Sequence, residues 1–256
     1  MKILESSLNL RVPKGMTNLD YSLSVDVAKA QLSYGADFYC NVEYMKCLDE
    51  EYLREFSQNG YQGITALFGK NHRGILCYIK EDYTVEVIKR MSDPHFLHFK
   101  ASKGDESYDI IVFRILTKNT SIEDFKDRSY QWDTVCNYID TMEDKSRIIL
   151  TGDWNHARIL SEYEEDKGQY YFSYQKIRTY LESRGISMGM DLQPGHREHS
   201  YTTEKGIKLA IDHIAIGEGL SFTKKPEYSD YYKKAPIGTP DHAYLFAEIN
   251  YKRRTL

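Results

Sequence analysis

One stretch decides the fold: Arg147-Ile-Ile-Leu-Thr-Gly-Asp-Trp-Asn-His156. Its apolar run at 148–150 has strong β preference and predicts a strand that is covered on both faces. Thr151-Gly152 ends the run, and a carboxylate, an indole, an amide and an imidazole follow at once. In α/β proteins such strands deliver reactive side chains at their carboxyl ends. Taken alone, the stretch is equally compatible with an ordinary turn, because Gly, Asp and Asn all tolerate tight backbone angles.

The two polar side chains that matter most in this stretch are Asp153 and Asn155. They are two residues apart, so in an extended segment they point the same way. One of them can hold a metal ion or a water molecule while the other donates a hydrogen bond to an oxyanion.

The bulk composition indicates a folded domain. The chain has 256 residues, 41% of them hydrophobic, which is enough to bury a full core. Its net charge of -4 argues against a generally basic nucleic-acid coat but not against a local basic groove. We find no internal repeat, low-complexity tract or linker, and we expect a single compact domain over residues 1–256.

Cysteine usage and the chain start suggest where the protein works. No C-x-x-C spacing occurs among the four cysteines, so they do not predict a metal site. The start Met1-Lys-Ile-Leu-Glu5 lacks a long apolar segment, and no run is long enough to cross a membrane. We expect a cytoplasmic protein with reduced thiols and no membrane contact.

Hydrophobic periodicity predicts alternating strands and helices mixed with meanders. The expected helices cover 21–34, 48–56, 128–142 and 170–184. The expected strands cover 2–10, 36–43, 74–79, 83–91, 95–99, 109–116, 148–150, 186–191, 201–202, 209–216 and 243–249. This order predicts an α/β (α+β) fold in which helices lie outside two sheets.

Further polar residues stand at the ends of other expected strands. They are Asn9, Glu43, Asp212, Asp241 and His242. Asp212 lies inside an apolar strand, and a buried carboxylate needs a partner or a metal. Acids and amides with one or two imidazoles, without a thiol cluster, suit a hard cation such as Mg²⁺ or Mn²⁺. Phosphodiester hydrolysis needs a metal, an oriented water and hydrogen-bond donors, and this set can supply all three.

At these residues the chain resembles the endonuclease/exonuclease/phosphatase superfamily, the deoxyribonuclease I-like proteins. Gly152-Asp-Trp-Asn155 is similar to the family's G-D-x-N signature, and Ile211-Asp-His-Ile214 to its late I-D-x-I strand. Thr239-Pro-Asp-His242 resembles the terminal S-D-H, with Thr-Pro in place of Ser. Ser7-Leu-Asn9 resembles the first-strand asparagine motif, and Asn41-Val-Glu43 stands where the family has Q-E.

The resemblance implies a four-layer sandwich of two packed mixed β-sheets flanked by helices. It also implies that Glu43 binds a divalent metal, with Asn9 and Asp241 nearby as ligands or ligand-orienters. Asp153 would activate or orient the attacking water, and Asn155 would contact the scissile phosphate.

By the same resemblance, His242 would stabilise the pentacoordinate phosphate and Asp212 would orient His242. The family usually has His or Tyr in the central strand facing the phosphate, but here Arg114 or Ile115 falls there. Arg114 could bind phosphate or be a structural ion-pair member. Arg11 replaces an acid found in the abasic-site endonuclease relatives.

The expected function is metal-dependent cleavage of nucleic acid, DNA favoured over RNA, by a monomer. Lysines interleaved with tyrosines at 224–234 could guide a strand of nucleic acid. One alternative is a phosphatase or phosphodiesterase acting on a small or lipid phosphate ester. The other is a catalytically silent binding protein on the same fold. The sequence leaves two roles for Trp154, base stacking or packing. It also leaves two for His156, substrate contact or loop capping.

Overall fold

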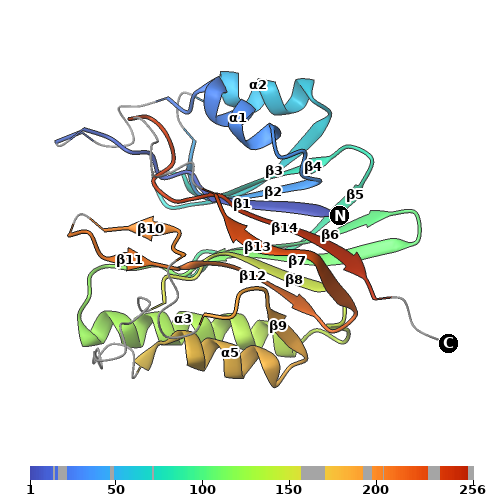
Figure 1. The fold of residues 1–256 in the computed structure, drawn as a ribbon, viewed down its shortest axis with the longest axis vertical. Helices are drawn as coiled ribbons and strands as arrows, with labels where there is room; N and C mark the ends of the chain where they lie inside the picture. Colours follow the sequence, from blue (N-terminus) through green and yellow to red (C-terminus); the bar gives the residue numbers. More distant parts are fainter. Residues whose placement is uncertain are drawn as a thin grey trace.

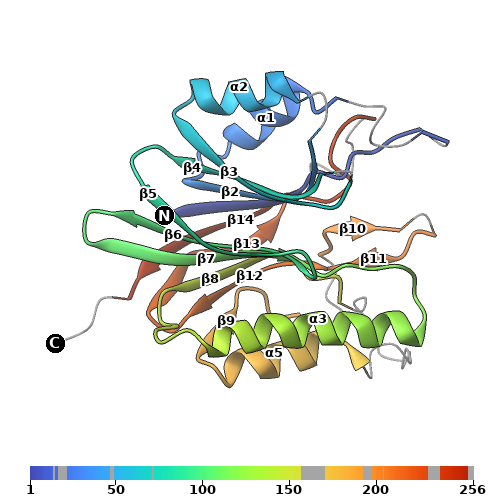
Figure 2. The ribbon, with the colours of Figure 1, turned by 180° about the vertical axis from the view of Figure 1, so that it is seen from behind.

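The molecule has four layers. The computed structural model describes residues 1–13, 15–16, 22–46, 49–70, 72–156, 171–192, 198–203, 205–229 and 237–252. Two six-stranded sheets lie face to face, with a pair of helices outside each (Figure 1). The view from behind shows the same layers (Figure 2). The predicted four-layer α/β sandwich is confirmed.

The first sheet has the strand order β13-β14-β1-β2-β4-β3. β1 and β2 are parallel and the other neighbours antiparallel. Its strands are β1 (Lys2–Ser7), β2 (Phe38–Met45), β3 (Tyr61–Phe68), β4 (Arg73–Lys80), β13 (Leu220–Tyr228) and β14 (Leu245–Tyr251). Helices α1 (Val25–Leu32) and α2 (Glu50–Gln58) cover its outer face (Figure 1).

The second sheet has the order β5-β6-β7-β8-β12-β9, with only β7 and β8 parallel. Its strands are β5 (Thr84–Met91), β6 (His95–Lys103), β7 (Glu106–Arg114), β8 (Ile148–Asp153), β9 (Ile186–Met188) and β12 (Asp212–Gly217). Helices α3 (Ile122–Asp140) and α5 (Tyr174–Glu182) lie outside it (Figure 1). A small hairpin joins β10 (Tyr201–Thr202) to β11 (Lys208–Leu209). None of the described helices is long and apolar enough to cross a membrane.

The main core fills the space between the sheets. Ile3 and Phe38 from the first sheet share one apolar cluster with Ile110, Ile149 and Ile214 from the second. Every residue of β1 after Lys2 and every residue of β8 is buried, so apart from Glu5 and Asp153 these strands are apolar or small-residue runs and do not alternate. The predicted double burial of the strand at 148–150 is therefore confirmed.

Two strands, β3 and β13, are missing from the sequence-based prediction. Each is the outermost strand of the first sheet, and its solvent-facing residues dilute the apolar pattern. β13 also contains Lys224, Lys225 and Pro226, which read as a surface loop. Proline is tolerated at such an edge because no further strand needs its backbone N–H.

Helix α3 begins at Ile122, six residues before the predicted start. Ser121 is its N-cap, and the Ser121 side chain accepts a hydrogen bond from the backbone N–H of Asp124. Hydrophobic periodicity could not show this first stretch, because four of its six residues are polar or charged. Two other predictions were too long: the strand at 186–191 ends at Met188, and the segment 209–216 divides between β11 and β12.

Gly152 is required by the backbone itself. Its φ is +132°, and a Cβ added there would lie 2.0 Å from the carbonyl oxygen of Phe113 in β7. Gly152→Ala is expected to lower the free energy of unfolding by at least about 3 kcal/mol, because neither strand can move without losing pairing. Urea unfolding measures this loss. Gly104→Ala is the control: its φ is +58° with open space around it, so it should cost only about 1–2 kcal/mol. Equal losses would contradict the explanation.

Candidate active site

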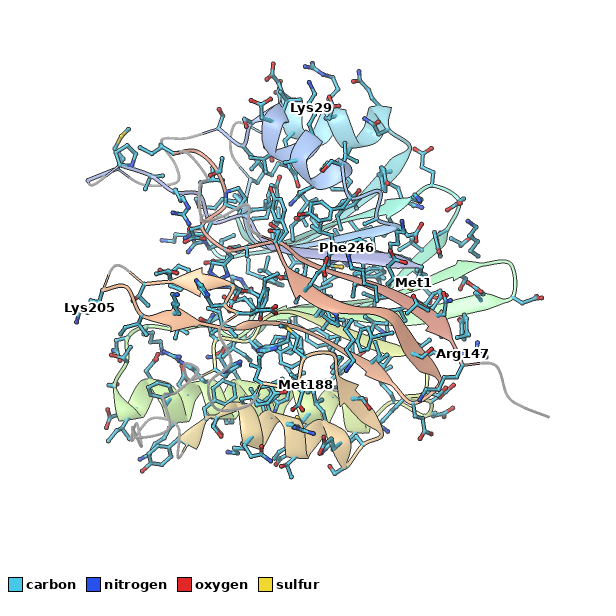
Figure 3. The ribbon with its side chains drawn as sticks, in the orientation of Figure 1. Met1, Lys29, Arg147, Met188, Lys205 and Phe246 are labelled. Carbon is cyan, nitrogen blue, oxygen red and sulfur yellow. The ribbon has the colours of Figure 1, made fainter. Side chains whose placement is uncertain are left out.

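The predicted site residues converge at one end of the sandwich. β1 and β2 are parallel, as are β7 and β8, so within each pair the carboxyl ends lie at the same edge. Figure 3 shows Arg147, which precedes β8, at the end of the molecule opposite Lys205 in the β10–β11 hairpin. Since β8 runs away from Arg147, the site lies at the hairpin end.

Asp212 and His242 form a buried pair. His242 Nδ1 lies 2.8 Å from Asp212 Oδ2, so the imidazole donates this hydrogen bond and its Nε2 points elsewhere. Burial alone would lower the pKa of His242, but the carboxylates of Asp212 and Asp241 outweigh it and hold the pKa well above its ordinary value. The imidazole is therefore a cationic donor near neutral pH.

Asp153 lies directly opposite Asp212 in the β8–β12 ladder. Burial and the facing carboxylate raise the pKa of Asp153 to about 7. Asn155 donates to it twice, from its backbone N–H at 3.1 Å and from its side-chain amide at 2.6 Å. The amide also donates to the carbonyl oxygen of Ile115 at 2.8 Å. Asn155 thus holds Asp153, and its φ of +45° is one that asparagine adopts more readily than most residues.

Glu43 enters the site through an irregularity in β2. The β2–β4 register shifts between Asn41 and Tyr44, and Glu43 has a φ of +56°. Such a backbone costs about 1–2 kcal/mol for a residue with a Cβ and is typical of functional positions. Ser7 Oγ donates to Glu43 Oε2 at 2.9 Å, and Arg114 Nη2 lies 2.8 Å from Oε1. Burial alone would raise the pKa of Glu43, but the nearby positive charges, Arg114 foremost, outweigh it and hold the pKa below its ordinary value.

Asn9 and Asp241 meet at the rim of the site. Asn9 Nδ2 donates to Asp241 Oδ2 at 2.7 Å, and Asn9 Oδ1 accepts from Arg73 at 3.2 Å. Leu10 forms an isolated β-bridge with Pro240, which brings the segment after β1 against the segment before β14. The two predicted residues, 232 positions apart in the chain, are thereby held side by side.

The donor set fits a divalent cation. One ligand atom from each of Glu43, Asp153 and His242 lies within 4.8 Å of the other two. Asp241 Oδ1 is buried and has no hydrogen-bond partner among the described residues, so it is a further available oxygen. Carboxylate oxygens without sulfur suit Mg²⁺ or Mn²⁺, and the protonated His242 stands beside them as a hydrogen-bond donor and not as a ligand. The predicted metal ligands were Glu43, Asp241 and Asn9. Of these, only Glu43 belongs to the group of three residues whose ligand atoms lie within 4.8 Å of one another.

Three residues at the site were not predicted. Ser7 contacts Glu43 directly, and its position two residues before Asn9 was a signal that it faces the same side. Arg73 begins β4 and reaches Asn9. His95 begins β6, opposite Arg114 in the ladder, and burial together with Arg114 lowers its pKa to about 4, so it is neutral. Nothing in the local sequence links Arg73 or His95 to the motifs.

The aromatic residues around Asp153 are structural. Trp154 is fully buried and stacks on Phe113 with centroids 5.3 Å apart, so it packs and does not stack on a base. His156 and His213 are buried against each other, with centroids 4.6 Å apart. His213 is therefore a packing residue.

The lysine and tyrosine segment is only partly described, because residues 230–236 lie outside the described part of the chain. Of its described members, Lys224 pairs with Glu227 on the exposed surface of β13. Tyr228 donates to the backbone carbonyl of Asp212 at 2.6 Å. Tyr228 therefore supports the strand that carries Asp212.

Glu5 is a buried acid beneath the site. It is fully buried in β1, and neither carboxylate oxygen has a hydrogen-bond partner in the described part of the chain. Burial, and next the Asp212 carboxylate, raise the pKa of Glu5 well above its ordinary value. The sequence pattern did not single out this residue, which alternates into the core like its apolar neighbours.

Glu5→Met is expected to raise the free energy of unfolding at pH 8 by about 1–3 kcal/mol, because it removes unsatisfied polar atoms. The folded-state pKa lies above the unfolded one, so the wild-type protein loses stability as pH rises above the ordinary value of 4.5. The gain should therefore be larger at pH 8 than at pH 4.5 in urea unfolding. Glu86→Met, on exposed β5, is the control. A gain independent of pH would contradict the assignment.

The two six-stranded sheets and their flanking helices form the deoxyribonuclease I-like fold, which this chain shares with several solved nuclease structures. A 3'-5' exonuclease (NExo) from Neisseria meningitidis matches with a TM-score of 0.65 and 14% identity, over 98% of this chain and 100% of that one. The human Nocturnin catalytic domain matches with a TM-score of 0.65 and 14% identity, over 98% of this chain and 94% of that one. An AP endonuclease from Archaeoglobus fulgidus matches with a TM-score of 0.64 and 15% identity, over 98% of this chain and 99% of that one.

These likenesses are of fold, because the sequences differ at more than four positions in five. No protein-family model matches the chain, and a search of curated proteins found no match.

Proposed function

We propose that the chain is a divalent-metal-dependent phosphoesterase that cuts nucleic acid, with DNA favoured over RNA. The observation that carries the proposal is the buried Asp212–His242 pair beside Glu43 and Asp153, with ligand atoms of Glu43, Asp153 and His242 within 4.8 Å of one another. Such a set combines cation ligands, a base and a cationic donor. Structures of the same fold include a TDP2 from D. rerio with single-strand DNA product and a Neisseria enzyme with a product DNA hairpin.

Glu43 is the proposed principal metal ligand, and Asp241 offers Oδ1, which has no hydrogen-bond partner among the described residues and lies 3.9 Å from His242 Nε2. Asn9 donates to the other oxygen of Asp241, so it would orient that ligand. A bound divalent cation supplies polarisation of a phosphate oxygen.

Asp153 is the proposed acceptor of the proton of the attacking water, since a pKa of about 7 suits a base working near neutral pH. Asn155 keeps the Asp153 carboxylate in place through two hydrogen bonds. This geometry supports a positioning role for Asn155 in addition to the phosphate contact implied by the family resemblance.

His242 is the proposed donor to the phosphate oxygens as negative charge builds up on them. Its Nδ1 is held by Asp212, which sets the direction of the ring and stabilises the imidazolium. Asp212 therefore acts through His242.

We also propose that residues 1–256 work as one domain, since a single core cluster draws on both sheets.

A substrate panel tests the proposal. Purified protein is incubated with supercoiled plasmid, single-stranded DNA and RNA in Mg²⁺, Mn²⁺ or EDTA. We expect cleavage of DNA with a metal and none with EDTA. Turnover of a small phosphate ester without cleavage of any nucleic acid would overturn the nuclease proposal. Binding of nucleic acid without any turnover would identify a silent binding protein.

A phosphatase acting on a terminal phosphate is the second candidate. Three guanidinium groups lie at the site: Arg114 on Glu43, Arg73 on Asn9, and Arg11 within 3.4 Å of the Asp241 carbonyl oxygen. A terminal phosphate carries more negative charge than a diester and would gain more from them. The Neisseria enzyme of the same fold is described both as a 3'-5' exonuclease and as a 3' phosphatase. A 3'-phosphorylated oligonucleotide in the panel separates the two candidates.

A further inference from the structure

Arg114 places a permanent positive charge among the proposed metal ligands. It ends β7, and its side chain is only 14% exposed. Arg114 Nη2 lies 2.8 Å from Glu43 Oε1, and Arg114 Nε lies 3.3 Å from Asp153 Oδ2. The guanidinium thus bridges two carboxylates that belong to opposite sheets.

The bridge occupies one of the two carboxylate oxygens of Glu43, which are the atoms that a metal at this residue would bind. Glu43 Oε2 accepts from Ser7 Oγ at 2.9 Å, and Oε1 is the partner of Arg114. A divalent cation and a guanidinium on the same oxygen would lie a few ångströms apart, where like charges repel strongly in a buried site. Binding of a cation at Oε1 is therefore expected to weaken or displace the Arg114 contact.

A displaced Arg114 has a natural anionic partner. Guanidinium groups pair with phosphate oxygens in a two-pronged geometry and stay charged at all working pH values. Arg114 Nε can keep its contact with Asp153 Oδ2, 3.3 Å away, while Nη2, once released from Glu43, pairs with a substrate anion. The phosphate of the substrate, which must sit next to the metal, is the anion within reach of this side chain.

We propose that Arg114 is an internal cation that competes with the divalent metal for Glu43, and that its release couples metal binding to phosphate binding. The inference rests on the proposed function for the existence of the metal site. In the metal-free protein Arg114 would then be the main neutralising charge on Glu43, with Arg73 Nη2 4.0 Å from the same oxygen. The metal and a phosphate then bind cooperatively, since each favours the state in which Arg114 has left Glu43.

Direct titration of metal-free protein with Mn²⁺, followed by electron paramagnetic resonance and calorimetry, tests the competition. Arg114→Met is expected to bind Mn²⁺ roughly 10-fold more tightly than wild type, within the usual range of coupling between sites. Inorganic phosphate should tighten Mn²⁺ binding several-fold in wild type and leave it unchanged in Arg114→Met. Arg114→Lys, which keeps the charge but cannot bridge both carboxylates, should fall between them.

Arg90→Met is the matched control, because it makes the same change of charge at an exposed residue of β5 whose side chain donates to the Thr65 carbonyl oxygen. It should bind Mn²⁺ as wild type does. Thermal unfolding guards against a misfolded variant: Mn²⁺ should raise the Tm of Arg114→Met more than that of wild type, since the metal replaces the lost positive charge.

Glu43→Gln separates the two possible failures. If Mn²⁺ binds to wild type and Glu43→Gln abolishes it, the metal site stands, and equal or weaker Mn²⁺ binding by Arg114→Met would overturn the competition alone. If neither wild type nor Arg114→Met binds Mn²⁺, both the metal site and the competition are wrong.

Discussion

Replacing His242 by glutamine is expected to lower the rate of phosphodiester hydrolysis by roughly 10²–10⁴-fold, with the fold intact. Glutamine has nearly the reach of histidine but cannot carry a positive charge. The wild-type imidazole is charged near neutral pH because Asp212 holds its Nδ1 at 2.8 Å and Asp241 adds a second carboxylate. The loss should fall on kcat, since the charge on phosphate increases in the transition state. Single-turnover cleavage of a labelled oligonucleotide measures it.

A matched histidine serves as the control. His98 also faces a carboxylate, with its Nε2 3.0 Å from Asp109, but it lies in β6 against Tyr138 of α3, away from the site. His98→Gln should cleave at the wild-type rate. Asp212→Asn and His242→Gln combined should be little slower than the worse single variant, because the two residues act as one unit. Losses that multiply would show that Asp212 acts separately from His242.

Asp153→Asn is expected to lower the rate by roughly 10³-fold or more, because the amide can neither accept a proton nor bring negative charge to the site. The swap also disturbs the local hydrogen bonds. The Asp153 carboxylate accepts from the backbone and side chain of Asn155 and from Arg114. An amide has one acceptor oxygen, so at least one of these donors would face an N–H group.

Asp140→Asn is the control for loss of one carboxylate. Asp140 lies at the end of α3 and pairs with Arg184 on the outer surface. Asp140→Asn should cleave at the wild-type rate. Circular dichroism and thermal unfolding should show that Asp140→Asn and Asp153→Asn are both folded. Near-wild-type cleavage by Asp153→Asn would show that another group takes the proton from water.

Much of the fold follows from local chemistry in the sequence. Continuous apolar runs predicted the buried strands β8 and β12, because a strand covered on both faces has no polar side to show. The edge strands β3 and β13 escaped prediction for the opposite reason, since their mixed residues face both core and solvent. The early start of α3 depends on one capping hydrogen bond from Asp124 to Ser121, which hydrophobic periodicity does not record.

Some residues of the candidate site could likewise be predicted from the sequence, and others could not. Asp212 could be predicted to need a partner, because a carboxylate inside an apolar strand is costly when unpaired. Its partner His242 came from the family resemblance, and the structure places the two 2.8 Å apart. Arg73 and His95 could not be predicted, since Arg73 meets Asn9 through a long-range side-chain hydrogen bond and His95 meets Arg114 through strand pairing.

The sequence by itself determined the buried strand at 148–150 and the order of the polar strand ends. These are local properties, set by β preference, backbone angles and the alternation of side chains. Only the tertiary structure decided that Arg114 bridges Glu43 and Asp153. Glu43 and Arg114 belong to different sheets, and their distance depends on how the two sheets pack and on the irregularity that turns Glu43 inward. Long-range packing of this kind leaves no periodic trace in either strand.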